Sequence, residues 1–318
     1  MLYLLELFFG LLLLVKSAHY LVDGASSIAK RFNISNFVIG MTVVAFGTTS
    51  PELVVNLISS FQGRVEFSVG NILGSNIANI LLVLGIASVI HTVKVKRHVV
   101  SKELPLGILV TLVVAVLAND MIIDGRAVSH LTRTDGFVLL SFFIIFLYYT
   151  FTLARHQKRE EDHVKRLSKT RSIFYILAGI FGLALGGEFV VDGAIYITSL
   201  LGVSDSTVGL LVLAVGTSLP ELATVITASL KNHSNLAVGN IIGSNLFNIL
   251  WILGLSAIIM PIPFILSTNY DFGAVIFANL ALLAVCLVGK KKMVIEKKEG
   301  FFFLFLYALY VASLIMRG

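Results

Sequence analysis

Charged residues are scarce in this chain of 318 residues, since lysine, arginine, aspartate and glutamate together make up only 13% of it. A soluble domain carries about 25% charged residues, and the 57% of apolar residues found here is typical of a protein embedded in a bilayer. Cysteine is almost absent as well. Cys286 is the only one, which excludes disulfides within the chain and metal sites built from cysteine.

Two further absences narrow the architecture. Strand-like alternation of polar and apolar residues is missing, so the pattern favours a bundle of helices over a membrane barrel. The first apolar stretch has no basic region before it and carries Glu6 early, so we expect a membrane helix there rather than a signal peptide. A spanning helix needs about 20 apolar residues. The sequence predicts an all-α polytopic membrane protein with ten transmembrane helices, near residues 2–29, 36–61, 67–91, 102–119, 133–155, 172–199, 205–230, 235–259, 270–289 and 300–317.

Two motifs each occur twice in the chain. The first is GMTVVAFGTTSPE at residues 40–52 and GLLVLAVGTSLPE at residues 209–221. The second is VGNILGSNIANIL at residues 69–81 and VGNIIGSNLFNIL at residues 238–250. A single offset of 169 residues aligns both pairs without a gap.

The repeat also predicts how the two halves are oriented. Five predicted helices separate equivalent points, and an odd number turns the second copy over in the membrane. Inverted halves of this kind are common in alternating-access transporters. We therefore expect two inverted five-helix repeats, residues 1–155 and 172–318, joined by a charged linker at residues 156–171.

Basic residues gather on one side of the predicted topology. The side that holds both termini carries four lysine or arginine residues, and the opposite side carries 19, seven of them between Arg155 and Arg171. Basic residues mark the cytoplasmic side of a membrane protein. We therefore expect both termini outside the cell and the linker inside it. This distribution accounts for the net charge of +6 better than nucleic-acid binding does.

The first motif places a glutamate in the middle of an apolar helix, directly after a proline. Pro51 cannot donate to the carbonyl of Gly47, so the helix should break or kink there and leave main-chain carbonyls without helical partners. These carbonyls, the Thr48 and Thr49 hydroxyls and the Glu52 carboxylate form an oxygen-rich wall that suits hard cations such as Ca²⁺. A carboxylate inside a membrane is by default functional. The other half supplies the same wall through Gly216, Thr217, Ser218, Pro220 and Glu221.

The second motif combines small residues with amides, and its glycines and serine allow membrane helices to approach closely. Ser75 and Asn79 are four residues apart and share one face of a helix. The same holds for Ser244 and Asn248, so we expect these four side chains to line a site. The remaining amides suit interhelical hydrogen bonding and site-lining roles equally well: Asn71, Asn76, Asn240 and Asn245.

The charge of two glutamates at one site predicts a mechanism. Two ionised carboxylates carry a charge of about −2, which one Ca²⁺, two Na⁺ or two protons would neutralise. The same ligands satisfy only one of these loads at a time, so binding is competitive. Uncompensated charge in a low-dielectric site should resist moving, so loaded states cross the membrane and the empty state does not. The result is obligatory exchange.

The paired G-T-[ST]-x-P-E and G-S-N-x-x-N elements resemble the α-repeats of the cation/Ca²⁺ antiporter superfamily, above all its prokaryotic sodium/calcium exchangers. The resemblance covers nearly the whole chain. It implies a sodium/calcium antiporter of the prokaryotic cell membrane that works by alternating access at a midplane site, with long first and sixth helices that slide across the bundle. It implies a transporter rather than an enzyme. Ca²⁺ and Na⁺ are then the substrates, and the lipid bilayer is the surrounding partner. We expect no cofactor, no bound nucleic acid and no obligate protein partner.

The resemblance also implies a role for each motif residue. Ca²⁺ would be bound by two carboxylates and two threonine carbonyls, those of Glu52, Glu221, Thr48 and Thr217. Flanking Na⁺ sites and the centre between them would use Ala45, Ala214, Thr49, Ser218, Ser75, Ser244, Asn79 and Asn248.

Two positions depart from the family pattern. Thr49 stands where serine is common, which keeps the hydroxyl and adds a methyl group. Asn248 stands where many members, notably K⁺-dependent ones, have aspartate. The amide lowers the negative charge of the site, which argues against coupling to K⁺.

Other functions are weaker interpretations of the same residues. A Ca²⁺/H⁺ or other cation/H⁺ antiporter on the same scaffold is the main alternative, because protons can neutralise the same carboxylates. An intramembrane protease would need a serine–histidine arrangement, a metal cluster or an aspartate dyad, and no histidine lies in either motif. A channel would not call for inverted repeats. A plain proline kink with a glutamate paired to a buried base would not explain a duplicated element without a recurring basic residue.

Overall fold

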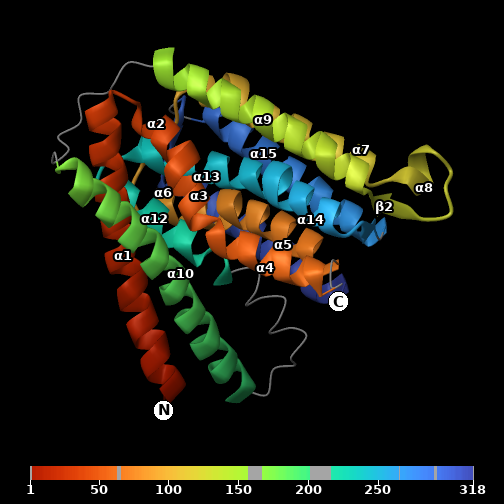
Figure 1. Cartoon of the computed structure of the whole chain (residues 1–318), viewed down its shortest axis with the longest axis horizontal. Helices are drawn as coiled ribbons and strands as arrows, with labels where there is room; N and C mark the ends of the chain where they lie inside the picture. Colours follow the sequence, from red (N-terminus) through yellow and green to blue (C-terminus); the bar gives the residue numbers. More distant parts are fainter. Residues whose placement is uncertain are drawn as a thin grey trace.

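The structure is a computed structural model that describes residues 2–62, 66–156, 167–200, 216–264, 266–289 and 292–317. Helices dominate the described residues (Figure 1), as the sequence predicts. In chain order the elements are α1 (Leu2–Phe32), α2 (Asn36–Ile39), η1 (Gly40–Val44), α3 (Ala45–Thr48), α4 (Ser50–Phe61), α5 (Glu66–Ile77), η2 (Ala78–Val83), α6 (Leu84–Ile90), β1 (Val93–Lys94), η3 (Val99–Glu103), α7 (Leu104–Leu117), α8 (Asp120–Ile123), β2 (Ser129–Leu131), α9 (Arg133–His156), α10 (Lys169–Leu200), α12 (Leu219–Leu230), α13 (Ser234–Leu246), η4 (Phe247–Ile252), α14 (Leu253–Ile259), β3 (Ile262–Phe264), η5 (Leu266–Thr268), α15 (Asn269–Val288), β4 (Val294–Ile295) and α16 (Lys297–Arg317).

Eight helices in the described part of the chain are long and apolar enough to cross a membrane. A ninth span is a bent pair, Asn36–Thr48 and Ser50–Phe61, whose two parts meet at an angle of 46°. The predicted break at the first motif is therefore confirmed. The span expected at residues 205–230 is described only from Gly216 onward, where α12 is a shorter apolar helix, and residues 201–215 lie outside the described residues.

The two longest helices, α1 and α10, pack against each other along their length, and Figure 1 shows them side by side on one flank of the bundle. Small residues make this contact possible. A Cβ atom added to Gly179 would lie 2.7 Å from the main-chain nitrogen of Leu21, and one added to Gly10 would lie 2.9 Å from the Gly186 carbonyl oxygen. Near the C-terminal end of α1, the Ser172 hydroxyl donates to the Ser27 hydroxyl over 2.9 Å.

The helices that carry the motifs cross at close range. A Cβ atom added to Gly243 of α13 would lie 2.6 Å from the Met41 carbonyl oxygen, and one added to Gly40 would lie 2.5 Å from the Leu236 carbonyl oxygen. Only glycine permits such an approach of one main chain to another. The small residues of the second motif therefore bring α13 of the second half against η1 of the first half.

Two short antiparallel ladders join connections from opposite halves of the chain. β1 pairs with β4, Val93 opposite Ile295, and β2 pairs with β3, Ser129 opposite Phe264. The sequence pattern did not predict these strands, because two or three residues are too few to show alternation. The offset of 169 residues carries β1 onto the start of β3, so a similar ladder is made twice.

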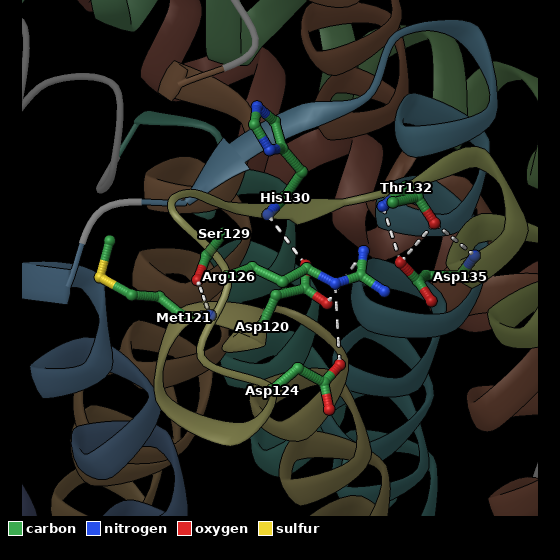
Figure 2. A network of polar contacts seen from close by, with 8 residues as sticks. All are labelled: Asp120, Met121, Asp124, Arg126, Ser129, His130, Thr132 and Asp135. Carbon is green, nitrogen blue, oxygen red and sulfur yellow. Dashed lines mark hydrogen bonds and ion pairs between the residues drawn. The ribbon is translucent and has the colours of Figure 1, made fainter.

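The connection between α7 and α9 is ordered by polar contacts, which Figure 2 shows. The Asp120 carboxylate accepts from the main-chain nitrogen of His130 over 3.3 Å and lies 3.9 Å from the Arg126 guanidinium. The hydroxyl of Thr132 donates to the Asp135 carboxylate over 2.6 Å. That carboxylate also accepts from the Thr132 main-chain nitrogen, which fixes the start of α9.

Candidate functional site

From Gly216 onward, where the second copy of the first motif is described, it matches the first copy at the helix break. At the break between α3 and α4, Thr49 has φ −83° and ψ 1°, and at the start of α12, Ser218 has φ −84° and ψ 1°. A proline occupies the first turn of each following helix, where its missing N–H costs nothing. Glu52 and Glu221 sit in those first turns and are 1% and 0% exposed. The positive end of a helix dipole favours a negative charge at such a position.

Each copy of the first motif contacts the second motif of the opposite half. The Thr48 hydroxyl donates to Asn240 Oδ1 over 3.1 Å, and the Thr217 hydroxyl donates to Asn71 Oδ1 over 3.3 Å. The serines repeat this pattern, since Ser244 Oγ lies 3.5 Å from Thr48 Oγ1 and Ser75 Oγ lies 3.3 Å from Thr217 Oγ1. Residues 169 positions apart thus make equivalent contacts. Asn71 and Asn240, whose role the sequence left open, hold the threonine hydroxyls.

Four amides join the two halves at the centre. Asn79 Nδ2 donates to Asn245 Oδ1 over 3.0 Å, and Asn248 Nδ2 donates to Asn76 Oδ1 over 2.9 Å. The side chains of Asn76 and Asn245 also donate to each other's main-chain carbonyls, over 3.2 and 3.4 Å. Asn76 and Asn245 are therefore interhelical hydrogen-bonding residues. Their side-chain oxygens accept from the amide nitrogens of Asn79 and Asn248, and the amide oxygens of Asn79 and Asn248 accept no hydrogen bond.

Both carboxylates are buried from solvent. Ser244 Oγ donates to one oxygen of Glu221 over 3.3 Å, and the Thr217 side chain interacts with Glu52. Among the described residues, no lysine, arginine or histidine forms an ion pair with either glutamate. The alternative of a glutamate paired to a buried base therefore has no support there.

Four oxygens of this cluster are buried and accept no hydrogen bond. They come in pairs related by the repeat: Glu52 Oε2, Glu221 Oε2, Asn79 Oδ1 and Asn248 Oδ1. A buried acceptor without a donor costs about 1–3 kcal/mol, and more when it is charged. Acceptors without donors suit a cation, and hard cations prefer carboxylate and amide oxygens.

The other predicted site residues differ in what surrounds them. The Ala45 carbonyl accepts from the main-chain nitrogen and the hydroxyl of Thr49, and from the Thr48 hydroxyl over 3.3 Å. It is thus free for a cation only when a hydroxyl turns away. Ser218 is buried at the second break. Ala214 lies outside the described residues. The described residues also contain no group of three or more His, Cys, Asp or Glu side chains that could hold a metal, so the oxygens above must include neutral ones.

One feature of the site was not predicted from the residue pattern. Asn79 and Asn248 lie in π-helical segments, η2 and η4, which begin at equivalent residues, Ala78 and Phe247. A π-helical turn inserts an extra residue per turn and often occurs at functional sites. It turns the asparagine relative to the serine four residues before it, and no residue pattern marks it.

The apolar spans and the buried polar cluster between them define an integral membrane protein with a cation-suited centre. Comparison with known proteins agrees. The profile of the family described as sodium/calcium exchanger protein matches residues 2–152 and 171–316. The chain belongs to this family.

Relatives of known name cover almost the whole chain. It is 38% identical to the putative antiporter CaxA of Alkalimonas amylolytica over 92% of each chain. It is 29% identical to the sodium/calcium exchanger MaX1 of Methanosarcina acetivorans, over 98% of this chain and 97% of that one. Among solved structures, the sodium-calcium exchanger NCX_Mj soaked with Na⁺ and Ca²⁺ superimposes with a TM-score of 0.83 at 32% identity, over 99% of both chains.

Proposed function

We propose that this protein exchanges Na⁺ for Ca²⁺ across a membrane, binding the two ions in turn at one site between its halves. Family membership and the NCX_Mj likeness support cation/Ca²⁺ exchange in general. The observation that carries the specific proposal is the set of four buried oxygens without donors, two from carboxylates and two from amides. Two carboxylates match one Ca²⁺ or two Na⁺ in charge, so the ions compete.

Within this proposal the motif residues divide the ligand roles. Glu52 and Glu221 bind Ca²⁺ with the Thr48 and Thr217 carbonyls. The remaining positions line the Na⁺ sites and the centre: Ala45, Ala214, Thr49, Ser218, Ser75, Ser244, Asn79 and Asn248. The hydroxyl–amide contacts support this division, because they fix the side chains that flank the carboxylates.

We also propose that the chain consists of two inverted five-helix repeats with ten transmembrane helices, residues 1–155 and 172–318. Equivalent amide contacts at an offset of 169 residues support this. The same offset relates β1 to the start of β3, and each of these strands pairs with a strand from the other half. Alternating access then follows from motion of α1 and α10 against the rest. Their close packing and the Ser27–Ser172 bond suit movement as one unit.

A flux experiment on reconstituted vesicles tests the proposal. Vesicles loaded with Na⁺ should take up ⁴⁵Ca²⁺ from a Na⁺-free medium, and vesicles loaded with choline should not. A proton gradient, acid inside, should drive no uptake in the absence of Na⁺. Uptake driven by protons alone would favour the Ca²⁺/H⁺ alternative, which rests on the same two carboxylates. Uptake with no counter-ion at all would indicate a channel.

A further inference from the structure

A stripe of buried polar residues runs along α4 away from the central site. Glu52, Asn56 and Ser60 follow one another at intervals of four residues, so they share one face of the helix, and each is 1% exposed. The helix begins at the central break and ends at Phe61, which is 75% exposed. The stripe thus leads from the carboxylate of the site toward the Phe61 end of the helix.

The amide of Asn56 is held in one orientation and its oxygen lacks a partner. Its Nδ2 donates to the Glu52 carbonyl over 2.7 Å, so its Oδ1 points the other way. That oxygen is buried and accepts no hydrogen bond. The nearest hydroxyl on the stripe does not satisfy it, since Ser60 Oγ donates to the main-chain carbonyl of Asn56 over 2.8 Å. A buried amide oxygen without a donor costs about 1–3 kcal/mol, so it gains from a donor or a cation beside it.

The spacing lets one cation contact both side chains. The Cβ atoms of residues four apart on a helix lie about 6 Å from each other. Oxygens that bind one Ca²⁺ at about 2.4 Å can be up to about 5 Å apart, which the two side chains can reach. Glu52 Oε2 is itself buried without a donor. One helical turn therefore presents two unpaired oxygens, one from a carboxyl group and one from an amide.

The other half does not repeat this arrangement. The residue at the offset of 169 from Asn56 is Val225, which is fully buried. On α12 the nearest polar group beyond Glu221 is the hydroxyl of Thr224, which is buried and without a partner. The amide oxygen is thus present on only one approach to the site. Its loss should therefore change the apparent affinity for a cation that arrives from that side of the membrane, and not from the other.

We propose that Asn56 Oδ1 and the Glu52 carboxylate form an entry subsite for a partly hydrated hard cation, Na⁺ or Ca²⁺, on the Phe61 side of the central site. This subsite rests on the proposed exchange function and adds a position outside the ligand set of the central site. A cation arriving from the Phe61 side exchanges part of its water shell for these oxygens before it reaches the centre. One arriving from the opposite side meets the Thr224 hydroxyl instead.

The test is Na⁺-driven Ca²⁺ uptake in right-side-out and in inside-out membrane vesicles, with Asn56→Val as the variant. Valine is what the chain itself uses at the equivalent position. The apparent KM for Ca²⁺ should rise about threefold to tenfold when Ca²⁺ is presented from the Phe61 side, the size expected for losing one neutral oxygen ligand. The KM from the opposite side and both maximal rates should stay unchanged.

Two further variants complete the experiment. Ser60→Ala removes a hydroxyl from the same stripe that already has a partner, and it should leave both KM values unchanged. Asn56→Asp should lower the KM from the Phe61 side, which keeps the idea testable if the valine variant does not fold. Equal changes in KM from both sides, or no change from either side, would overturn the subsite. The Asn56 oxygen would then be assigned to hydrogen bonding with a bound water. A wild-type protein without Na⁺-driven uptake would instead overturn the exchange function, and the subsite with it.

Discussion

At the scale of single residues, the two glutamates carry the charge of the proposed site. Replacing Glu52 or Glu221 by glutamine removes one negative charge with little change in shape. Each variant should abolish Na⁺-driven Ca²⁺ transport, because a divalent ion gains more from each anionic oxygen than a monovalent ion does. The measurement is ⁴⁵Ca²⁺ uptake into Na⁺-loaded vesicles, with membrane insertion checked by the amount of folded protein. Uptake at the wild-type rate in either variant would make that glutamate structural.

In the proposed site, Asn79 and Asn248 place neutral amides at the centre, which predicts that transport does not depend on K⁺. A carboxylate at either position would add a third negative charge and call for a further monovalent cation. We therefore expect uptake to continue at the same rate when K⁺ is replaced by choline on both sides of the membrane. Asn248→Asp should introduce either a K⁺ requirement or a step inhibited by protons, because a carboxylate titrates and an amide does not. A wild-type protein that stops without K⁺ would contradict this interpretation.

The sequence predicted much of the site at this scale, and the limits have physical causes. The sequence could propose Glu52 and Glu221 because a carboxylate beside a proline in an apolar helix has few structural uses, and it could propose the threonines and serines because they recur in both copies of the motifs. Asn71, Asn76, Asn240 and Asn245 could not be assigned, because an amide donates and accepts equally well and its role depends on the helix opposite. The structure supplies that helix, as in the bond from Thr48 to Asn240. Asn56 could not be singled out from the sequence, because the proposed subsite rests on an amide oxygen whose lack of a partner only the structure shows.

At the scale of elements, one contact of α1 is not shared by the two halves. Lys231 at the end of α12 lies 2.5 Å from the Asp23 carboxylate of α1. The offset of 169 residues relates these positions to Gln62 and Asp192, where the basic partner is absent. If α1 moves against the rest of the bundle, this ion pair favours the arrangement in which α1 stays next to α12.

Breaking this pair should change the balance between the two open states only slightly. Asp23 is 48% exposed and Lys231 is 24% exposed at their side chains, and exposed pairs contribute about 0.2–1 kcal/mol. Asp23→Asn should therefore shift the ratio of apparent Ca²⁺ affinities measured from the two sides by no more than about fivefold. Asp192→Asn is the matched control and should leave the ratio unchanged. An exchange of charges, Asp23→Lys with Lys231→Asp, should restore the wild-type ratio, and its failure to do so would argue against the pair.

At this scale, the sequence predicted some kinds of element and missed others. The long spans and the break before Pro51 were predicted, because apolar length and a missing N–H act locally. The π-helical segments η2 and η4 were not, since they depend on how α13 and α5 pack across the centre. The β ladders were missed for a similar reason, because Val93 and Ile295 pair across the whole chain.

At the scale of the whole molecule, the repeat and the basic residues together predict how the chain sits in the membrane. Nineteen basic residues fall on one side of the predicted topology and four on the other. A cysteine at Lys292, an exposed position next to β4, should be protected from an impermeant thiol reagent in intact cells. A cysteine at Asp124, which is exposed in the connection drawn in Figure 2, should react. The native Cys286 is fully buried and serves as the unreactive background.

The two labelling positions also test the orientation and the repeat separately. Permeabilised cells are the control, because both cysteines should then react. The opposite pattern in intact cells, with Lys292→Cys labelled and Asp124→Cys protected, would reverse the orientation of the whole molecule and keep the inverted repeat. Equal labelling at both positions in intact cells would place them on one side of the membrane. That result would contradict the odd number of spans on which the inversion depends, and with it the proposal that two opposed halves share one cation site.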